Sequence, residues 1–229
     1  MILLDKIVVI TGGNSGIGQA LAYAFARKGS IVVILARNKQ RLQATLQYLQ
    51  VYNKQSAAYV CDVTQQKKVE HTFKAILKKY GSIDILVNNA GFGMYRGFHA
   101  SSIEDFRSLM NTNYFGTVYC TKAVLPSMLQ HKKGRIVNIA SVAGKAGFPG
   151  NAGYCASKFA VVGLSEVLHY ELKDKGIAVH LICPGAVETA FPKNSPGYEF
   201  FDHKRRHTYI ITPEDVAKAT LDALETPRF

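Results

Sequence analysis

Short runs of apolar, often β-branched residues alternate along the chain with longer segments in which apolar positions recur every three or four residues. The short runs predict strands and the longer segments predict amphipathic helices, because these are the spacings at which side chains share one face. The expected strands cover residues 6–11, 31–36, 57–61, 83–88, 135–140 and 178–183. The expected helices begin near Gly16, Asn38, Gln65, Ser102 and Ala152.

Some of the expected strands are apolar at every position, as in the run IVVIL at residues 31–35. A strand of this kind suits a parallel sheet that is covered on both faces. The alternation of strands with helices implies βαβ units, and hence a doubly wound α/β fold with six or seven mostly parallel strands. No repeat, low-complexity stretch or linker interrupts the alternation. We therefore predict a single domain over residues 1–229.

Local signals indicate where three segments begin or change. Ser101 with Glu104 three residues later is a capping-box pattern for a helix that runs towards Pro126, where we expect a bend. Thr212 precedes a proline and two acidic residues, which is a pattern typical of a helix start. Residues from about 188 to 211 include many aromatics and show no clear periodicity of apolar positions. We interpret them as a long functional loop that could include a short helix.

The chain has a formal net charge of +12, with local basic clusters at residues 131–135 and 203–207. Charge alone allows nucleic-acid binding, but no helix-turn-helix, RNA-recognition or zinc-finger pattern is present. We therefore expect no nucleic-acid partner. A solvated surface, or attraction to anionic cofactors and lipids, explains the charge equally well.

The four cysteines, at positions 61, 120, 155 and 183, have neither C-x-x-C spacing nor the spacing of metal ligands. No apolar run reaches the roughly 18 residues of a membrane span, and residues 1–6 do not form a signal peptide. We therefore expect free thiols, no metal site, and a cytoplasmic protein. Membrane association is not visible in this sequence.

A glycine-rich turn, TGGNSGIG, follows the first expected strand and opens the first helix. Its glycines allow a sharp turn that brings backbone N–H groups and a helix N-terminus up to a dinucleotide pyrophosphate, as in a Rossmann fold. The alternative is a plain strand-to-helix turn. The expected cofactor contacts in the turn are Gly12, Asn14, Ser15, Gly16, Ile17 and Gly18.

The end of the second strand carries Arg37 at the place where an acidic residue would bind the adenosine ribose of NAD. An arginine binds a 2′-phosphate instead, so we predict NADP(H) over NAD(H), with help from Asn38 and Arg41. The alternative is that Arg37 is only a solvated residue before a helix. Asp62, after the third strand, is placed to reach the adenine, and Asn89 follows the fourth strand in the same way.

Tyr154 and Lys158 lie four residues apart and share one face of an expected helix, with Ser141 upstream. A neighbouring ammonium favours the phenolate and lowers the pKa of a tyrosine, so Tyr154 could exchange a proton near neutral pH. Ser141 adds a second donor that could point at the same oxygen. The alternative is a packed tyrosine beside a solvated lysine.

Together these motifs resemble the short-chain dehydrogenase/reductase family in its common one-domain form. They occur in the family's order, with similar spacing, over nearly the whole chain. The matching positions are Thr11, Gly12, Gly16, Gly18, Asp62, Val63, Asn88, Asn89, Ala90, Gly91, Asn113, Ser141, Tyr154, Lys158, Pro184, Gly185 and Thr189.

The resemblance implies the role of each catalytic position. Tyr154 would be the general acid or base at the substrate oxygen, and Ser141 would orient that oxygen. Lys158 would bind the nicotinamide ribose and lower the pKa of Tyr154. Asn113 would anchor a water that relays protons to Lys158. Asn111 lies on the same segment but fits the family's position less well.

The resemblance also implies which residues hold the cofactor beyond the glycine turn. Asp62, Val63, Asn89, Ala90 and Gly91 would lie along the dinucleotide. At the nicotinamide end we expect Tyr154, Lys158, Pro184, Gly185, Val187 and Thr189. The activity implied is hydride transfer between a nicotinamide and a carbonyl or secondary alcohol.

The expected substrate loops are rich in aromatics, which favours a lipophilic ketone such as a keto-lipid or a steroid-like compound, and the pattern is similar to that of the ketosphinganine reductases. Alternatively, these side chains only pack the loops onto the core. Two other functions stay open: an NAD-dependent oxidative alcohol dehydrogenase, and a catalytically silent protein that senses dinucleotides. The resemblance further implies a homodimer or homotetramer, and one more strand beyond the last helix, before which this sequence ends at Phe229.

Overall fold

The structure is a computed structural model that describes residues 2–200 and 209–225. Six parallel strands form one sheet in the order β3-β2-β1-β4-β5-β6. Their bounds are β1 (Ile7–Thr11), β2 (Ile31–Ala36), β3 (Ala57–Val60), β4 (Ile85–Asn88), β5 (Gly134–Ile139) and β6 (Ile177–Ile182). The α/β fold and its six strands are therefore confirmed, with ends that differ from the expected ones by one or two residues.

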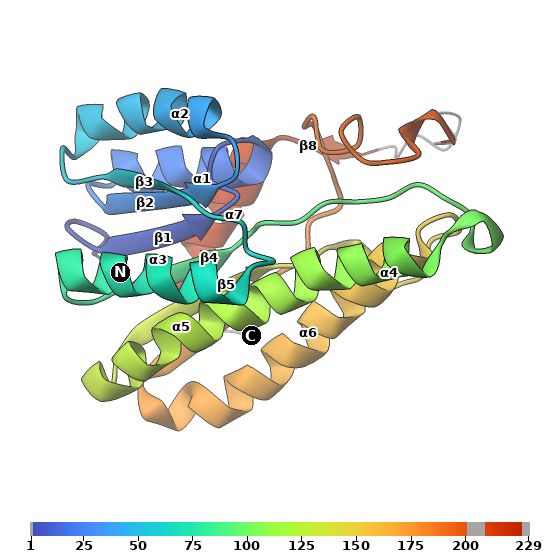
Figure 1. Ribbon diagram of the computed structural model, residues 1–229. Coiled ribbons are helices and arrows are strands. Elements are labelled where there is room, and N and C mark those ends of the chain that lie inside the picture. The colour runs from blue at the N-terminus through green and yellow to red at the C-terminus, as the bar shows by residue number, and fades with distance from the viewer. Residues whose placement is uncertain (1, 201–208, 226–229) are drawn as a thin grey trace.

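Helices cover both faces of the sheet (Figure 1). Helices α1, α2 and α7 lie on one face and α3, α5 and α6 on the other. The bounds are α1 (Gly16–Arg27), α2 (Lys39–Tyr52), α3 (Gln66–Tyr80), α4 (Ile103–Leu109), α5 (Gly116–His131), α6 (Ala152–Leu172) and α7 (Pro213–Glu225), with short 3₁₀ turns at Phe98–Ala100, Val142–Gly144, Lys173–Lys175 and Tyr198–Phe200.

Strand β1 shows why these apolar runs become central strands. Its side chains alternate between two cores: Val9 packs on the side of α3 and α5, and Val8 packs on the side of α1 and α2. All five of its residues are buried, and its one polar side chain, that of Thr11, donates a hydrogen bond to Val87 O. Phe73 of α3 and Phe25 of α1 fill the two cores, and each such burial contributes about 1.5–3 kcal/mol.

The strand order reverses between β1 and β4, because the chain returns from β3 at one edge to the middle of the sheet. In open parallel sheets, ligands bind beyond the carboxyl ends of the strands at such a point. The loops that follow β1 and β4 therefore mark where the site should lie.

The helical stretch between Ile103 and His131 differs from the expectation. Helix α5 continues through Pro126, and the regular α pattern is interrupted earlier, by a π-helical turn at Met110–Phe115 that contains Asn113. A π turn inserts an extra residue into the helix and often occurs at functional sites.

The capping box of α4 is formed by Ser102 and Asp105 rather than by Ser101 and Glu104. The Asp105 N–H donates to Ser102 Oγ at 3.1 Å, and the Ser102 N–H donates to the Asp105 carboxylate at 2.9 Å. Ser101 belongs to the preceding turn, because its hydroxyl donates to Gly97 O.

The region expected as a long loop ends in a short strand, β8 (Ile210–Ile211), which pairs in parallel with β7 (Ala186–Val187) just before the region. The helix start at Thr212 is confirmed, since its hydroxyl accepts from the Asp215 N–H at 3.1 Å. The basic cluster at 203–207 and the expected strand after α7 fall outside the described residues. None of the helices in the described ranges, 2–200 and 209–225, is long and apolar enough to cross a membrane.

Candidate active site

The turn after β1 is held against the end of β4 by Asn89. Its Nδ2 donates to Thr11 O at 3.0 Å and to Gly12 O at 3.3 Å, and its backbone N–H donates to Thr11 Oγ1 at 3.0 Å. The two loops at the reversal point of the sheet are thereby joined, and Asn89, expected near a cofactor, has a structural role in the turn.

Two of the glycines in this turn are required, one by close approach and one by its backbone conformation. A Cβ on Gly18 would lie 2.3 Å from Gly12 O, and Gly16 has a positive φ of 50°. Ser15 precedes α1 in an extended conformation, and its side chain makes no capping hydrogen bond. The first N–H groups of α1 therefore lack a side-chain cap, which fits an anion such as a pyrophosphate.

The residues expected near the adenosine lie at the next strand ends. Arg37 is exposed and directly follows β2. Asn38 caps α2, because its side chain accepts from the Arg41 N–H at 2.9 Å. The Asp62 carboxylate is engaged by Thr64, which donates to it through its N–H at 3.0 Å and its hydroxyl at 2.8 Å.

Asn113 of the π turn connects three parts of the site. Its Nδ2 donates to Phe92 O at 3.0 Å and to Ser157 Oγ at 2.9 Å, and its Oδ1 accepts from the Phe92 N–H at 3.0 Å. Its side chain is 1% exposed, so these bonds are made away from water. The π turn thus contacts both helix α6 and the loop after β4.

Lys158 of α6 is 5% exposed, which is unusual for a lysine. Its Nζ donates to Ile139 O at 2.9 Å, and a Cβ on Gly91 would lie 3.7 Å from the same nitrogen. Burial lowers the pKa of Lys158 to about 8. Val63, expected on the cofactor, is buried against Gly116.

Tyr154 lies one turn before Lys158, with the Lys158 Nζ 5.8 Å from the centre of its ring. The expectation of a lowered Tyr154 pKa is wrong for this structure: burial raises that pKa to about 12, and a hydrogen bond with the Ser141 side chain only partly offsets the rise. The reason is that Lys158 is itself buried and bound to Ile139 O, so desolvation of the phenol dominates.

The segment after β6 closes the site from the other half of the chain. The Val142 N–H donates to Pro184 O at 3.0 Å, which joins the loops after β5 and β6. The Thr189 methyl group would lie 3.3 Å from a Cβ on Gly16, so this segment reaches the glycine turn. Gly185 is exposed and Val187 lies in β7.

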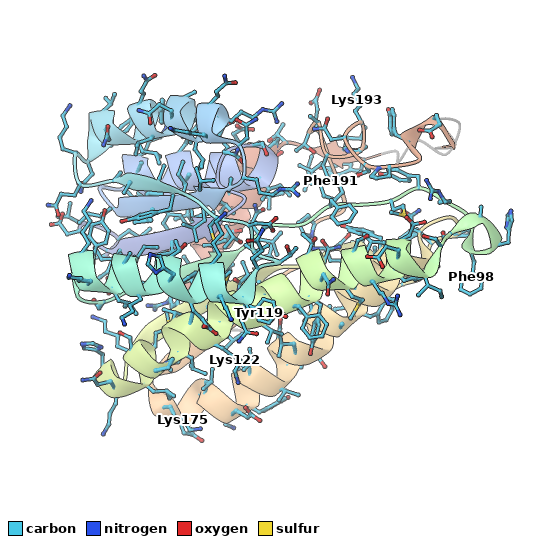
Figure 2. All side chains as sticks on the ribbon, in the orientation of Figure 1. Phe98, Tyr119, Lys122, Lys175, Phe191 and Lys193 are labelled. Carbon is cyan, nitrogen blue, oxygen red and sulfur yellow. The ribbon has the colours of Figure 1, made fainter. Side chains whose placement is uncertain are left out.

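Phe191, labelled in Figure 2, was expected among the aromatics of the substrate loops but was not given a place beside Tyr154. Its ring centre lies 6.0 Å from that of Tyr154. A Cβ on Gly93 would lie 2.9 Å from Phe191, so the ring also covers the loop after β4. Ser157 was missed as well. Its signal was available, since a small polar residue between Tyr154 and Lys158 at a buried helix position needs a partner.

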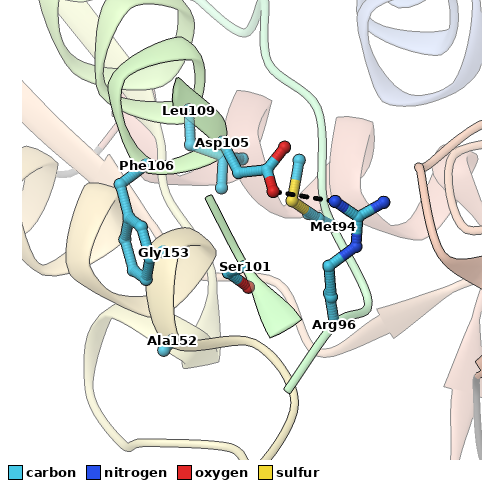
Figure 3. A pocket seen from close by; sticks show the side chains of 8 residues that line it. All are labelled: Met94, Arg96, Ser101, Asp105, Phe106, Leu109, Ala152 and Gly153. Atoms are coloured by element: carbon cyan, nitrogen blue, oxygen red, sulfur yellow. Dashed lines mark hydrogen bonds and ion pairs between the residues drawn. The ribbon is translucent and has the colours of Figure 1, made fainter. Parts of the chain in front are cut away.

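A small pocket beside Tyr154 is bounded by the loop after β4, by α4 and by the start of α6 (Figure 3). Arg96 Nη1 and Asp105 Oδ2 form an ion pair at 2.8 Å, and the Arg96 N–H donates to Gly150 O at 2.8 Å. The residues that line the pocket are Met94, Arg96, Ser101, Asp105, Phe106, Leu109, Ala152 and Gly153. Arg96 thereby joins the loop after β4 to α4 and to the turn before α6.

Residues 6–197 match the family model described as short chain dehydrogenase. The chain belongs to this family. It is 34% identical over 228 residues to an uncharacterized oxidoreductase of Staphylococcus aureus (strain USA300), covering 99% of this chain and 94% of that protein. It is 38% identical over 198 residues to Dehydrogenase/reductase SDR family member 7 of Mus musculus, covering 84% of this chain and 59% of that protein.

Solved structures of short-chain dehydrogenases show the same fold. The chain superposes on an alcohol dehydrogenase from Thermococcus sibiricus, complexed with 5-hydroxy-NADP, with a TM-score of 0.85 and 29% identity, covering 97% and 91% of the two chains. For a short-chain dehydrogenase/reductase from Burkholderia phymatum in complex with NAD, the TM-score is 0.89 and the identity 28%, and the match covers 100% of this chain and 89% of that chain. For a variant of actinorhodin polyketide ketoreductase with NADPH, the TM-score is 0.87 and the identity 31%, and the match covers 95% of this chain and 89% of that chain.

The family, the fold and the bound dinucleotides of these structures agree with the uncapped α1 N-terminus and the glycine contacts of this chain. This short-chain dehydrogenase is an oxidoreductase that uses a nicotinamide dinucleotide. In the described residues, no cluster of three or more histidine, cysteine or acidic side chains is placed to hold a metal.

Proposed function

We propose that this short-chain dehydrogenase reduces a lipophilic ketone with NADPH. The observation that carries the proposal is the side-chain pair Tyr154 and Ser141 beside a buried Lys158. The dinucleotide supplies the hydride, and the protein must supply a proton and hold the carbonyl. A phenol with a pKa of about 12 is fully protonated at neutral pH and is therefore ready to donate.

The catalytic roles follow from these positions. Tyr154 donates its proton to the carbonyl oxygen as negative charge develops there, and the Ser141 hydroxyl donates a second hydrogen bond to the same oxygen. Lys158 holds the ribose hydroxyls of the nicotinamide half. The Asn113 Nδ2 already donates to Phe92 O and to Ser157 Oγ, so a relay water would bind an oxygen of Asn113. Oδ1 accepts from the Phe92 N–H and the main-chain O accepts from the Thr117 hydroxyl at 3.0 Å, and each oxygen has a second lone pair for the water.

Arg37 is the basis for NADPH over NADH. It is exposed at the end of β2, the strand beside β1, where the adenosine ribose of a dinucleotide lies in this fold. A guanidinium there attracts a 2′-phosphate and offers it two parallel hydrogen bonds. Asn38 assists by its place at the start of α2, although its side-chain oxygen already serves as the helix cap.

The aromatic wall above Tyr154 is the basis for a lipophilic substrate. Phe191 approaches Tyr154, and Tyr198 meets Tyr95 edge to face at 6.1 Å between ring centres. The Tyr95 N–H donates to Pro196 O at 2.9 Å, which holds the two loops together. Apolar side chains at the reacting group favour ketones whose substituents lose water on binding.

A homodimer through α5 and α6 is part of the proposal. The π turn before α5, α5 itself and α6 present exposed apolar side chains: Phe115 is 39% exposed, Leu129 37%, Phe159 46%, Val167 53% and Tyr170 67%. Rows of this kind are typical of a surface that binds another protein surface.

The four free cysteines fit a reducing cytoplasm.

The test is NADPH oxidation, followed at 340 nm, against ketones graded by chain length and matched by polar sugars and polyols. We expect kcat/KM to rise with apolar chain length, because each buried methylene adds about 0.8 kcal/mol. Activity confined to the sugars and polyols would overturn the lipophilic substrate. Absence of turnover with every carbonyl, despite NADPH binding, would overturn the reductase itself.

A further inference from the structure

A cavity of about 150 Å³ lies at the amino ends of β1, β4 and β5. The strand arrows of Figure 1 start at this edge. Lys158, one helical turn from Tyr154, binds Ile139 O at the carboxyl end of β5, so Tyr154 lies at the opposite end of the sheet from the cavity. It is lined by Lys6, Asp84, Lys133, Gly134 and Arg135. Its volume is several times the roughly 30 Å³ that one water molecule takes up in the liquid, so a small polyatomic ion fits with its remaining water.

The charges around this recess do not cancel. Lys6 Nζ lies 3.3 Å from Asp84 Oδ1, and Asp84 Oδ2 accepts from the Ile7 N–H at 3.0 Å. The only carboxylate of the lining is thus engaged by Lys6 and the backbone. Within residues 2–200 and 209–225, no ion pair is formed by Lys133 or Arg135. Lys133 is exposed to solvent, and Asp84 attracts the Arg135 guanidinium without forming an ion pair with it, so the lining keeps an excess of positive charge.

Arg135 provides the second observation. Its Nε is buried and has no hydrogen-bond partner among the described residues. Buried N–H groups are nearly always paired, and a charged one is the most costly to leave unpaired. An oxyanion in the recess adds negative charge beside this incompletely paired guanidinium, and a guanidinium binds an oxyanion in a bidentate way.

The edge around the recess is also basic. Exposed lysines stand there at the ends of helices and in the loops that lead into strands, namely Lys28, Lys54, Lys78, Lys79, Lys132, Lys173 and Lys175. Helix dipoles explain lysines at the carboxyl ends of helices. They do not explain Arg135, which lies within β5. The lysines raise the local concentration of anions, and the recess gives one anion a fitted place.

We propose that this recess binds a phosphate-type oxyanion, held by Arg135 and Lys133. The ligand class is inorganic phosphate, pyrophosphate or a phosphomonoester group. The site is separate from the glycine turn that faces the dinucleotide, because the two lie at opposite ends of the parallel strands.

The test is isothermal titration calorimetry with inorganic phosphate and with pyrophosphate. Arg135→Gln and Lys133→Gln should each weaken binding at least tenfold, and Arg135→Lys should weaken it less than Arg135→Gln. Lys175→Gln is the matched control, since it removes one charge from the same edge outside the lining, and it should change the affinity less than twofold. Equal losses in all the charge variants would overturn the proposal, because binding would then follow diffuse charge.

The same titration is repeated with saturating NADPH, to separate the recess from the dinucleotide site. Binding that persists and still depends on Arg135 supports the recess, whereas complete displacement by NADPH overturns it. Sedimentation with phosphatidic acid vesicles distinguishes a lipid headgroup from a free phosphate. If Arg135→Gln abolishes vesicle binding, the recess binds a lipid headgroup. If Arg135→Gln leaves vesicle binding intact and soluble phosphate does not bind, the proposal is overturned.

Discussion

Asn113 Nδ2 donates a hydrogen bond of 2.9 Å to Ser157 Oγ, and this bond joins the π turn to the helix that carries Tyr154 and Lys158. The Ser157 hydroxyl in turn donates to Tyr154 O at 2.8 Å. Both groups are buried, so water cannot replace either partner. A buried serine thus fixes how the Asn113 side chain lies against the turn of α6 that carries Tyr154.

Replacement of Ser157 by alanine should lower kcat about tenfold or more and leave the KM for NADPH nearly unchanged. The physical reason is that Asn113 loses its partner and the π turn is free to shift, which misplaces the groups around the reacting oxygen. Leaving the buried Asn113 amide unpaired should also cost about 1–3 kcal/mol of unfolding free energy. Steady-state kinetics and urea unfolding measure the two effects.

Ser165→Ala is the matched control for this change. Ser165 lies on the same helix, accepts from Asn138 Nδ2 at 2.9 Å and donates to Val161 O at 2.6 Å, but it is remote from Tyr154. Ser165→Ala should lower the free energy of unfolding by an amount similar to that of Ser157→Ala, but it should not lower kcat. Equal losses of kcat in both variants would show that Ser157 acts only through stability.

Tyr154→Phe should reduce turnover by about 10²–10⁴-fold, because the proposed mechanism makes the phenol the proton donor to the carbonyl oxygen. NADPH binding should stay within about threefold, since the ring and its contact with Phe191 remain. Fluorescence titration of NADPH and the 340 nm assay separate the two quantities. Unchanged turnover would refute Tyr154 as the donor.

The strands and the local motifs could be predicted because they depend on neighbouring residues. A run such as 31–35 is apolar throughout and suits only a buried strand, and Tyr154 and Lys158 share a helix face by spacing alone. The π turn at Asn113 depends instead on Phe92, a loop residue that contacts it only in the folded chain. The direction of the Tyr154 pKa shift was missed for the same reason, since burial by other segments outweighs the neighbouring lysine.

Arg37→Gln should raise the KM for NADPH by about ten- to a hundredfold and change the KM for NADH by less than threefold. The 2′-phosphate loses a charged, bidentate partner, which is worth about 1.5–3 kcal/mol. Lys39→Gln is the control, because Lys39 carries the same charge at the start of α2. A wild-type enzyme that turns over NADH as efficiently as NADPH would contradict this role of Arg37.

Gly18→Ala should abolish dinucleotide binding and destabilise the fold by about 1–3 kcal/mol, because overpacking forces the backbone to move. The new Cβ would lie 2.3 Å from Gly12 O and 2.4 Å from Asn89 Nδ2. Gly147→Ala is the control, since a Cβ there meets nothing within 4 Å. Thermal unfolding and NADPH titration of both variants check the prediction, which fails if Gly18→Ala binds NADPH like the wild type.

His180 should make the protein less stable in mild acid. Both its ring nitrogens are buried without a partner among the described residues, and burial, with Arg135 and His169 nearby, lowers its pKa to about 4. Because the unfolded chain takes up this proton near pH 6.5, stability contributed by neutral His180 is present above pH 6.5 and is lost as the pH falls towards 4, by up to about 3 kcal/mol. Urea unfolding between pH 7.5 and pH 4.5 measures the loss. His180→Gln should flatten this slope, whereas the exposed His99→Gln should not, and an unchanged slope in His180→Gln would assign the acid sensitivity to other groups.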